Sequence, residues 1–328
     1  MGCGEISELH AVSWKKIDGV QLAYAVDIVE EKALKMKQQY GLESHMTDYN
    51  KLMKLIDVDI VDVCVPTFLH PDVAVKAAEA GKQVFCEKPI ALSLADADRM
   101  IDSCRRKGVK FMIGFPRRFR PAWLALKETI LSGSLGRPII WRIFEGVSSG
   151  PHGRWFNEAE KGGGPFIDGF IHYYDFCIFT LGPVSEVFAS AYKMKEETSA
   201  IDSGSVILKL ASGDQMHLST SWGLPGFNYK ITGPGIHDVF GPKGVIILPR
   251  ENKLGEVGHL VLSGLEERKI VFSDDSIAGS FLAELAHFVE CIREDKTPRA
   301  TGEDGRRALK VALAVVESAK EGRPVKLN

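Results

Sequence analysis

Residues 58–89 read VDIVDVCVPTFLHPDVAVKAAEAGKQVFCEKP, and this stretch decides the fold. The apolar run VDIVDVCV predicts a strand that ends before Pro66, and QVFCE predicts a second strand. Between them, HPDVAVKAAEAGK predicts a helix that ends at Gly81. A strand, a helix and a strand at this spacing form a parallel βαβ unit. Both strands are almost continuously apolar, as expected for strands buried on both faces.

The same alternation continues on both sides of this unit. Before it, VQLAYAVD predicts a strand and EEKALKMKQQYG a helix that ends at Gly41. After it, SLADADRMIDSCRRKG predicts a helix that begins at Ser93, with Asp96 three residues later in an arrangement close to a capping box. VKFMIGF then predicts another strand. We therefore expect an α/β fold whose N-terminal domain, residues 1–116, is a doubly wound parallel sheet of the Rossmann type.

Beyond about residue 115 the strands follow one another directly. Gly213 and Asp214 lie between two alternating runs and predict a hairpin turn. Consecutive strands joined by short turns form an antiparallel sheet. We expect an α+β domain with a mainly antiparallel sheet over residues 117–328, closed by two helices. Its predicted strands are RPIIWRIFEG, VSEVFASAY, GSVILKLASGDQMHLSTSW, NYKITG, GVIILP, HLVLSG and RKIVF.

The composition is that of an ordinary globular protein, and 328 residues favour two domains. A net charge of −2 gives no electrostatic footprint for nucleic acid or an anionic membrane, so we expect neither partner. The sequence contains no C-x-x-C pair of the kind that suggests a metal site, and we predict no metal site. Dispersed cysteines in apolar runs, with no signal peptide and no membrane-length apolar run, predict a cytoplasmic protein. The six cysteines are Cys3, Cys64, Cys86, Cys104, Cys177 and Cys291.

The first seven residues, MGCGEIS, have the form of a dinucleotide-binding turn. Gly2 and Gly4 allow backbone N–H groups to approach a pyrophosphate, and the following ISELHAVSWKK has helical spacing. Asp27 then follows at about the 20-residue interval expected for the acid that binds the ribose hydroxyls. A carboxylate there favours NAD over NADP, although NADP remains open. The alternatives are a glycine-rich helix start without a ligand, and a solvated Asp27 in a turn.

Such a turn normally follows a buried central strand, and here only Met1 precedes it. Five buried apolar residues at ~1.5–3 kcal/mol each are worth roughly 10 kcal/mol, which is comparable to the net stability of a domain. We therefore expect the first strand to be missing, with Met1 internal to a longer reading frame. No other segment of the sequence is a candidate to replace it.

Two further stretches carry chemistry. Lys88, in CEKP, comes at the carboxyl end of a parallel strand, where ligands bind in open α/β sheets. We expect a cis bond to Pro89 that directs Lys88 into the crevice; the alternative is a surface lysine before a turn. In KGGGPFIDGFIHYYDF, residues 161–176, helical spacing places Asp168, His172 and Asp175 on one face. A histidine beside a carboxylate is a credible proton-transfer group, the alternative being a core histidine with a capping acid.

At these residues the sequence resembles the glucose–fructose oxidoreductase/inositol dehydrogenase family (Gfo/Idh/MocA), whose members are NAD(P)-dependent sugar and cyclitol dehydrogenases. The resemblance covers essentially the whole chain. It is most specific in the E-K-P motif and in the motif G-G-G-x-x-x-D-x-x-x-H. The matching segments are GCGEISELHA, VPTFLHPDVAVKAAEAGKQVFCEKPIAL, GFPRRFRPA and GGGPFIDGFIHYYD.

The resemblance implies three catalytic residues, Lys88, Asp168 and His172. His172 would accept the proton of the substrate hydroxyl, Asp168 would polarise His172, and Lys88 would contact the same oxygen. The stretch SSGPHGRWF departs from the commonest family wording, so the substrate stays open. The turn and the resemblance together predict cofactor contacts from Gly2, Gly4, Glu5, Ile6, Asp27, Pro66, Thr67, His70, Glu87, Lys88 and Arg118. The predicted substrate contacts are Lys88, Arg154, Trp155, Asp168 and His172.

Two classes of function follow from this reading. The first is an enzyme of class EC 1.1.1 that transfers a hydride between nicotinamide and a secondary alcohol or ketone of a sugar or cyclitol. The second is a non-catalytic NAD(P)-binding sugar sensor of the same fold. Retention of all three catalytic residues favours the enzyme. We expect a homodimer or homotetramer, because one face of the antiparallel sheet has no predicted cover.

Overall fold

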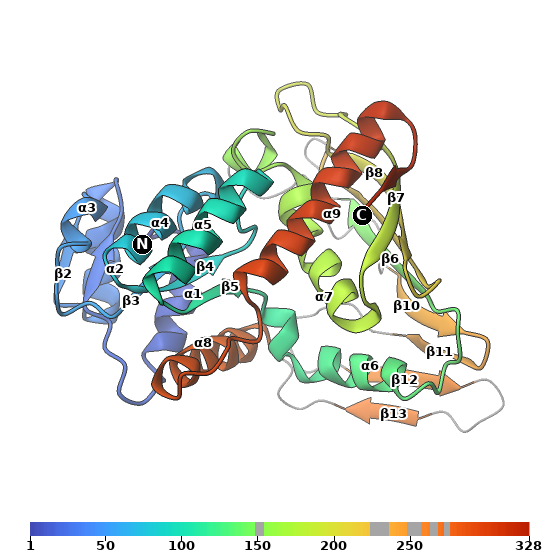
Figure 1. Cartoon of the computed structure of the whole chain (residues 1–328), viewed down its shortest axis with the longest axis horizontal. Coiled ribbons are helices and arrows are strands. Elements are labelled where there is room, and N and C mark those ends of the chain that lie inside the picture. Colours follow the sequence, from blue (N-terminus) through green and yellow to red (C-terminus); the bar gives the residue numbers. More distant parts are fainter. Residues whose placement is uncertain (148–153, 224–235, 248–256, 263–267, 272–275, 328) are drawn as a thin grey trace. The chain divides into compact units, whose positions relative to one another are not determined.

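The computed structural model describes residues 1–147, 154–223, 236–247, 257–262, 268–271 and 276–327 (Figure 1). The chain divides into two compact units. Unit 1 comprises residues 1–119 and 277–307, and unit 2 comprises residues 120–276 and 308–328. None of the described helices has the length and apolar character needed to cross a membrane.

Unit 1 contains the parallel strands that the βαβ pattern predicts. β1 pairs with β2, and a separate three-stranded sheet has the order β3-β4-β5. β4 and β5 are almost wholly buried, in agreement with their continuous apolar character. The short β2 was not predicted from the sequence. The strands are β1 (Tyr24–Val26), β2 (Ser44–Met46), β3 (Ile60–Val63), β4 (Gln83–Glu87) and β5 (Phe111–Gly114).

The helices of unit 1 begin and end largely where the sequence signals place them. The hydroxyl of Ser93 accepts a hydrogen bond from the Asp96 amide, and Gly41 and Gly108 end their helices with φ of 69° and 66°. Helix α1 packs against α8, and α4 packs against α5 (Figure 1). The helices are α1 (Glu5–Trp14), α2 (Glu30–Tyr40), α3 (Tyr49–Leu52), α4 (His70–Glu79), α5 (Leu94–Lys107) and α8 (Ile277–Arg293), with 3₁₀ turns η1 (Thr67–Leu69) and η2 (Pro116–Phe119).

Met1 and Gly2 lie between β1 and β3 and bond to both. The Met1 nitrogen donates to the Asp62 carbonyl at 2.6 Å, and the Cys64 amide donates to the Met1 carbonyl at 2.7 Å. The Gly2 amide donates to the Val26 carbonyl at 2.8 Å. Met1 and Gly2 thus connect β1 to the segment of β3 through backbone hydrogen bonds.

Unit 2 is built on a nine-stranded sheet of order β13-β12-β11-β10-β6-β9-β8-β7-β14. Its pairs are antiparallel except β6 with β9, and Gly213 lies in the predicted hairpin turn between β8 and β9. The predicted strand NYKITG lies outside the described residues. The strands are β6 (Ile140–Val147), β7 (Val184–Tyr192), β8 (Ser203–Leu210), β9 (Gln215–Ser221), β10 (Ile236–Gly241), β11 (Gly244–Ile247), β12 (Val257–Leu262), β13 (Arg268–Val271) and β14 (Val325–Lys326).

Alternating side chains give this sheet one buried face, which carries the core of unit 2. Trp123 of α6 (Pro121–Leu131) contacts Trp141 of β6 and Phe176 of α7 (Ile171–Leu181). The Ser318 hydroxyl of α9 (Gly302–Glu321) accepts a hydrogen bond from the Ala189 amide of β7. Helices α6, α7 and α9 thus cover the face on which the apolar residues of the strands are buried.

The division into units differs from the predicted domains at one place. The predicted boundary after residue 116 lies close to the observed boundary after residue 119. Residues 277–307, however, pack with unit 1 rather than with the C-terminal part of the chain. The reason is the apolar face of α8, from which Phe281 and Phe288 contact His10 and Phe85 of unit 1. A long-range packing of this kind leaves no local signal in the sequence.

Candidate functional site

The glycine turn has the geometry of an anion-binding cradle. Gly2 has φ of +80°, and a Cβ atom there would lie 2.5 Å from the Cys64 carbonyl oxygen, so the position requires glycine. Gly4 is the N-cap of α1, and no side chain caps this helix. A Cβ built on Gly4 meets no atom within 4 Å, which means that open space lies before the helix N-terminus. The N-terminal amide groups and this space fit a pyrophosphate group.

The side chains around the turn support this reading. The Asp27 carboxylate accepts hydrogen bonds from the Cys3 amide at 2.8 Å and from the Val29 amide at 2.9 Å. Asp27 is thereby held against the glycine turn. Ser7 is buried and bonds to the Gly4 carbonyl at 2.6 Å, so a small residue is needed there. Glu5 is exposed, and Ile6 is half-buried.

His70 connects the loops that follow β3 and β4. Its Nδ1 lies 2.8 Å from the Pro89 carbonyl oxygen, and its Nε2 lies 2.8 Å from the Val65 carbonyl oxygen. Burial lowers the pKa of His70 below its usual range. Thr67 is buried beside it, whereas Pro66 is half-buried. Both loops lie at the carboxyl ends of parallel strands, the edge at which ligands bind in such sheets.

Lys88 directly follows β4, and its peptide bond to Pro89 is cis, as the sequence analysis expects. The Lys88 amide donates to the carboxylate of Glu87 at 3.2 Å. Glu87 is itself buried and lies against Gly114, where a Cβ atom would be only 2.9 Å from the Glu87 carboxylate. The backbone at Lys88 is therefore held by a buried carboxylate from its own strand.

A buried polar cluster beneath this loop was missed by the sequence analysis. His10 Nδ1 lies 3.0 and 3.1 Å from the two carboxylate oxygens of Asp62, and His10 Nε2 lies 2.9 Å from Glu87. The Trp14 indole donates to Asp62 at 2.7 Å. Glu284 of α8 lies in the same cluster, fully buried. Within the described residues, neither carboxylate oxygen of Glu284 has a hydrogen-bond partner.

The charges of this cluster follow from its geometry. Burial by itself lowers the pKa of His10, but the neighbouring Cys64 and Asp62 outweigh burial and raise this pKa well above its usual range. Burial opposes ionisation of Asp62, yet the charge and hydrogen bonds of His10 lower the Asp62 pKa to about 2. Burial raises the pKa of Glu284 well above its usual range, and the charge of Glu87 adds to this effect. The surroundings thus favour the protonated forms of His10 and Glu284 and the ionised form of Asp62.

Arg118, a predicted cofactor contact, lies in η2 directly after β5. Its guanidinium is buried, donates to the Arg299 carbonyl at 2.6 Å and lies 3.1 Å from the Asp304 carboxylate. These contacts join the segment after β5 to the segment that leads into α9. They give Arg118 a structural role within unit 1, and a contact with the cofactor stays a prediction.

In unit 2, Asp168 and His172 lie on two different kinds of helical turn. Asp168 is buried in a π-helical turn, Pro165–Gly169, and His172 lies in the first turn of α7. The sequence analysis expected one continuous helix. The helical backbone begins only at Pro165, because Gly163 and Gly164 before it have φ of +80° and +70°, which ordinary helical residues do not adopt. Single π turns occur frequently at functional sites.

Gly162 and Gly164 are needed because backbone atoms of other segments approach them closely, and Gly163 is needed because the Ile167 side chain does. A Cβ atom on Gly162 would lie 2.5 Å from the Phe156 Cα atom. The Gly164 amide donates to the Phe156 carbonyl at 2.9 Å, and the Asp168 amide donates to the Gly164 carbonyl at 2.8 Å. Trp155, half-buried and stacked on Phe156, is thus tied to the turn that carries Asp168. Arg154 begins the same 3₁₀ turn, η3 (Arg154–Asn157), and its side chain lies outside the described part.

Comparison with known protein families identifies the family of this chain. Residues 1–115 match the family described as "Oxidoreductase family, NAD-binding Rossmann fold", and residues 127–327 match its "C-terminal alpha/beta domain". The chain belongs to the Gfo/Idh/MocA oxidoreductase family. Unit 1 is accordingly an NAD-binding Rossmann domain, as the glycine turn predicts, and the uncapped N-terminus of α1 suits that cofactor.

Relatives of known name cover the whole chain. A myo-inositol 2-dehydrogenase of Thermotoga maritima is 32% identical over 100% of this chain and 97% of the relative. A scyllo-inositol 2-dehydrogenase (NAD(+)) of Bacillus subtilis is 28% identical over 100% of this chain and 95% of the relative. The structure of a levoglucosan dehydrogenase in complex with NADH and levoglucosan has a TM-score of 0.85 over 99% of this chain and 97% of the other. At 20% identity, that structural likeness shows the fold.

The buried cluster of this family member generates a prediction on pH and stability. A carboxyl group whose pKa is raised by folding makes the folded state hold a proton that the unfolded state loses. The contribution of Glu284 to the stability of the folded state therefore falls as pH rises from the unfolded-state pKa of about 4.3 toward the folded-state pKa of Glu284. Glu284→Gln keeps the shape and removes this titration. The melting temperature of Glu284→Gln relative to wild type should rise steadily with pH over this range. Glu294→Gln, a substitution at an exposed position just after α8, serves as the control. A difference in melting temperature between Glu284→Gln and wild type that does not change with pH would contradict the raised pKa of Glu284.

Proposed function

We propose that this protein oxidises a secondary hydroxyl group of a cyclitol or sugar, or catalyses the reverse reduction. The main support is the 32% identity over the whole chain to a myo-inositol 2-dehydrogenase. Further support comes from the three residues Lys88, Asp168 and His172, which this chain carries in the motifs typical of the family. Cyclitols fit the named relatives best, since two of them act on inositols by name.

Each proposed role rests on a local arrangement. His172, in the first turn of α7, would accept the proton of the substrate hydroxyl. Asp168, one turn earlier and buried, would favour the protonated form of His172 through its negative charge. Lys88 would stabilise negative charge that develops on the reacting oxygen. When bound, NAD supplies the hydride acceptor that such an oxidation requires.

The remaining predicted contacts concern binding rather than proton transfer. Gly2 and Gly4 would present backbone amides to the pyrophosphate, and Asp27 would bond to the ribose hydroxyls. Arg154 and Trp155 would contact the substrate, because they adjoin the turn that carries Asp168. Cofactor roles for Glu5, Ile6, Pro66, Thr67, His70, Glu87 and Arg118 remain part of this proposal.

Assembly and location are also part of the proposal. The outer face of the sheet in unit 2 exposes Phe188 and Tyr192, at 39% and 63%, and such a face suits a contact between copies of the chain. We therefore expect a homodimer or homotetramer. The six cysteines are free, and all but Cys3 are buried, which suits a reducing cytoplasm. The small net charge favours a small-molecule substrate over nucleic acid or membrane partners.

A polyol panel tests the proposed function. Purified protein with NAD and myo-inositol, scyllo-inositol or a monosaccharide should form NADH, measured by its absorbance and fluorescence. The strongest turnover is expected with an inositol. NADH binding that responds to a polyol without any turnover would instead support the sensor, the alternative from the sequence analysis. No comparison favours that alternative.

Substitution of His172 tests the proton-transfer role. His172→Ala should lower kcat by about 10²–10⁴-fold, the usual contribution of a general base, and should leave the Kd for NADH within about twofold of wild type. Lys88→Met keeps the alkyl stem without the charge and should lower kcat/KM at least about 100-fold at an unchanged melting temperature. His217→Ala, a half-buried change on β9, is the control. Full turnover in His172→Ala would remove that residue from the mechanism.

Asp27 should set the preference for NAD over NADP. Its carboxylate offers hydrogen bonds to a free ribose and repulsion to a 2′-phosphate. Asp27→Asn should lower the ratio of kcat/KM for NAD to that for NADP by about tenfold or more, which corresponds to about 1.4 kcal/mol. Asp102→Asn, an exposed change on α5, is the control. A ratio that stays constant would show that another residue makes this choice.

A further inference from the structure

His10 lies in the interior of unit 1, and contacts with four other residues hold its imidazole ring. The residue is 1% exposed, and its two ring nitrogens bond to Asp62 and Glu87. The rings of Phe85 and Phe281 pack against it at centroid distances of 5.6 and 5.3 Å. A ring with both nitrogens bonded and aromatic neighbours packed against it keeps one orientation. His10 is therefore a fixed point on α1.

The Glu87 carboxylate connects this fixed ring to the next residue of β4's chain. Alternate side chains of a strand point to the same face, so Phe85 and Glu87 share the face that meets His10. One carboxylate oxygen of Glu87 lies 2.9 Å from His10 Nε2, and the other accepts from the Lys88 amide at 3.2 Å. The direction of the Lys88 N–H bond thus depends on the rotamer of Glu87, and that rotamer depends on His10.

The neighbouring strand β5 leaves room for this carboxylate at one residue, Gly114. Gly114 pairs with Glu87 in the register of the sheet. A Cβ atom at position 114 would lie 2.9 Å from one carboxylate oxygen of Glu87 and 3.2 Å from its carboxylate carbon. Gly114 is not among the glycines of positive φ, so its backbone would accept a side chain. The missing Cβ atom is therefore a requirement of the Glu87 side chain and not of the Gly114 backbone.

The residue after Lys88 is held in a similar way. Nδ1 of the buried His70 lies 2.8 Å from the Pro89 carbonyl oxygen. Lys88 itself is half-buried between these two supported peptide groups. A functional side chain keeps its geometry best when buried supporting residues fix the backbone that carries it. The surroundings of Lys88 have this arrangement.

We propose that His10 and Gly114 are positioning residues for Lys88, and that the Glu87 carboxylate transmits their effect. The inference rests on the proposed function, in which Lys88 acts at the reacting oxygen. A catalytic group misplaced by about 1 Å can cost about 10²-fold in rate. Loss of either positioning residue should therefore slow turnover, although neither residue contacts the reacting atoms in this mechanism.

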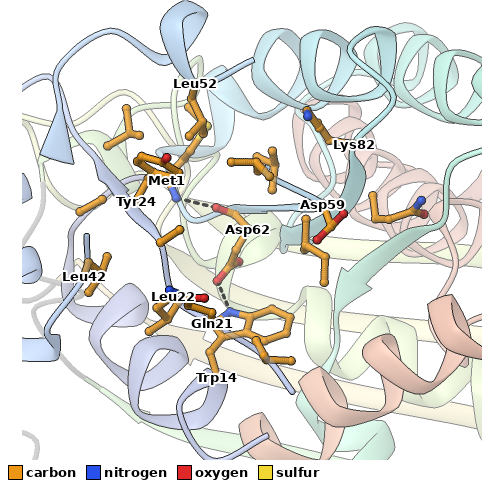
Figure 2. A pocket seen from close by; sticks show the side chains of 18 of the residues that line it. Met1, Trp14, Gln21, Leu22, Tyr24, Leu42, Leu52, Asp59, Asp62 and Lys82 are labelled. Atoms are coloured by element: carbon orange, nitrogen blue, oxygen red, sulfur yellow. Dashed lines mark hydrogen bonds between the residues drawn. The ribbon is translucent and has the colours of Figure 1, made fainter. Parts of the chain in front are cut away.

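Four variants of the full chain separate positioning from stability. His10→Leu removes both hydrogen bonds of the ring, whereas His10→Gln supplies an amide donor in place of Nε2. Gly114→Ala displaces the Glu87 carboxylate and leaves His10 unchanged. Trp14→Phe is the matched control: Figure 2 shows the Trp14 indole bonded to Asp62, the partner of His10 other than Glu87. This control weakens the same buried cluster without touching Glu87.

Hydrogen exchange and turnover are measured on each variant, with NADH saturating during exchange and kcat expressed per NADH-binding site. Exchange at the Lys88 amide should become at least about tenfold faster in His10→Leu and in Gly114→Ala. In these two variants kcat should fall about 10–100-fold, with the Kd for NADH within about threefold of wild type. His10→Gln should recover kcat to within about threefold of wild type. Trp14→Phe should keep the wild-type exchange rate and kcat, although it melts at a lower temperature.

Two results would overturn the proposal. One is a wild-type exchange rate or a wild-type kcat in Gly114→Ala, a test that stands even if His10→Leu does not fold. The other is an equal loss in Trp14→Phe and His10→Leu, because a general loosening of unit 1 would then explain both. A wild-type protein that forms no NADH with any polyol would instead contradict the proposed function. The exchange rates at Lys88 would still show whether His10 and Gly114 hold its backbone.

Discussion

The hydrogen bonds of His10 connect the helix and the strands of unit 1 that form its candidate cofactor-binding edge. His10 lies on α1, the helix that begins at the glycine turn, and its two ring nitrogens bond to Asp62 of β3 and Glu87 of β4. One side chain thus fixes the helix that begins at the glycine turn relative to two of the parallel strands. The cluster is enclosed by Phe85 and Phe281, and low polarity makes each charge interaction stronger. Loss of the imidazole at position 10 would remove the hydrogen-bond partner that Asp62 and Glu87 share.

The same cluster reaches the loop that carries the candidate catalytic lysine. Glu87 uses one carboxylate oxygen for His10 and the other for the Lys88 amide. The backbone at Lys88 is therefore tied, through a single carboxylate, to the helix that begins at the glycine turn. His70 adds a second tie, because it bonds to the carbonyl oxygens of Val65 and Pro89 in neighbouring loops. Glu87 and His70, which the family resemblance assigns to cofactor binding, thus also hold together the loops at this edge of the sheet.

In unit 2 the governing constraint is steric rather than electrostatic. Gly162, Gly163 and Gly164 allow Phe156, Ile167 and Ala200 to approach the backbone more closely than any side chain would permit. The chain leaves these glycines in a π turn, and this turn carries Asp168 into a buried position one turn before His172. A glycine-to-alanine change here would displace the turn itself, although glycine makes no contact through a side chain.

The sequence by itself determined the order of the elements, the parallel sheet of unit 1 and the type of the second domain. These features depend on local patterns: apolar runs, glycine stops such as Gly41 and Gly108, and the cap at Ser93, each readable within a few residues. The glycine turn, Asp27, Lys88 and the pair of Asp168 and His172 could be proposed as site residues for the same reason, since each belongs to a short motif.

Only the tertiary structure decided how residues distant in sequence meet. It packed α8 with unit 1, it broke the expected helix at Asp168 into a π turn, and it buried Arg118 against Asp304. It also assembled His10, Asp62, Glu87 and Glu284, which lie in four separate segments and form no motif. A lone histidine or a carboxylate in a strand has many local explanations. Which partner such a side chain meets depends on how whole helices and strands pack. The free energy of that packing is spread over many contacts that no short stretch of sequence contains.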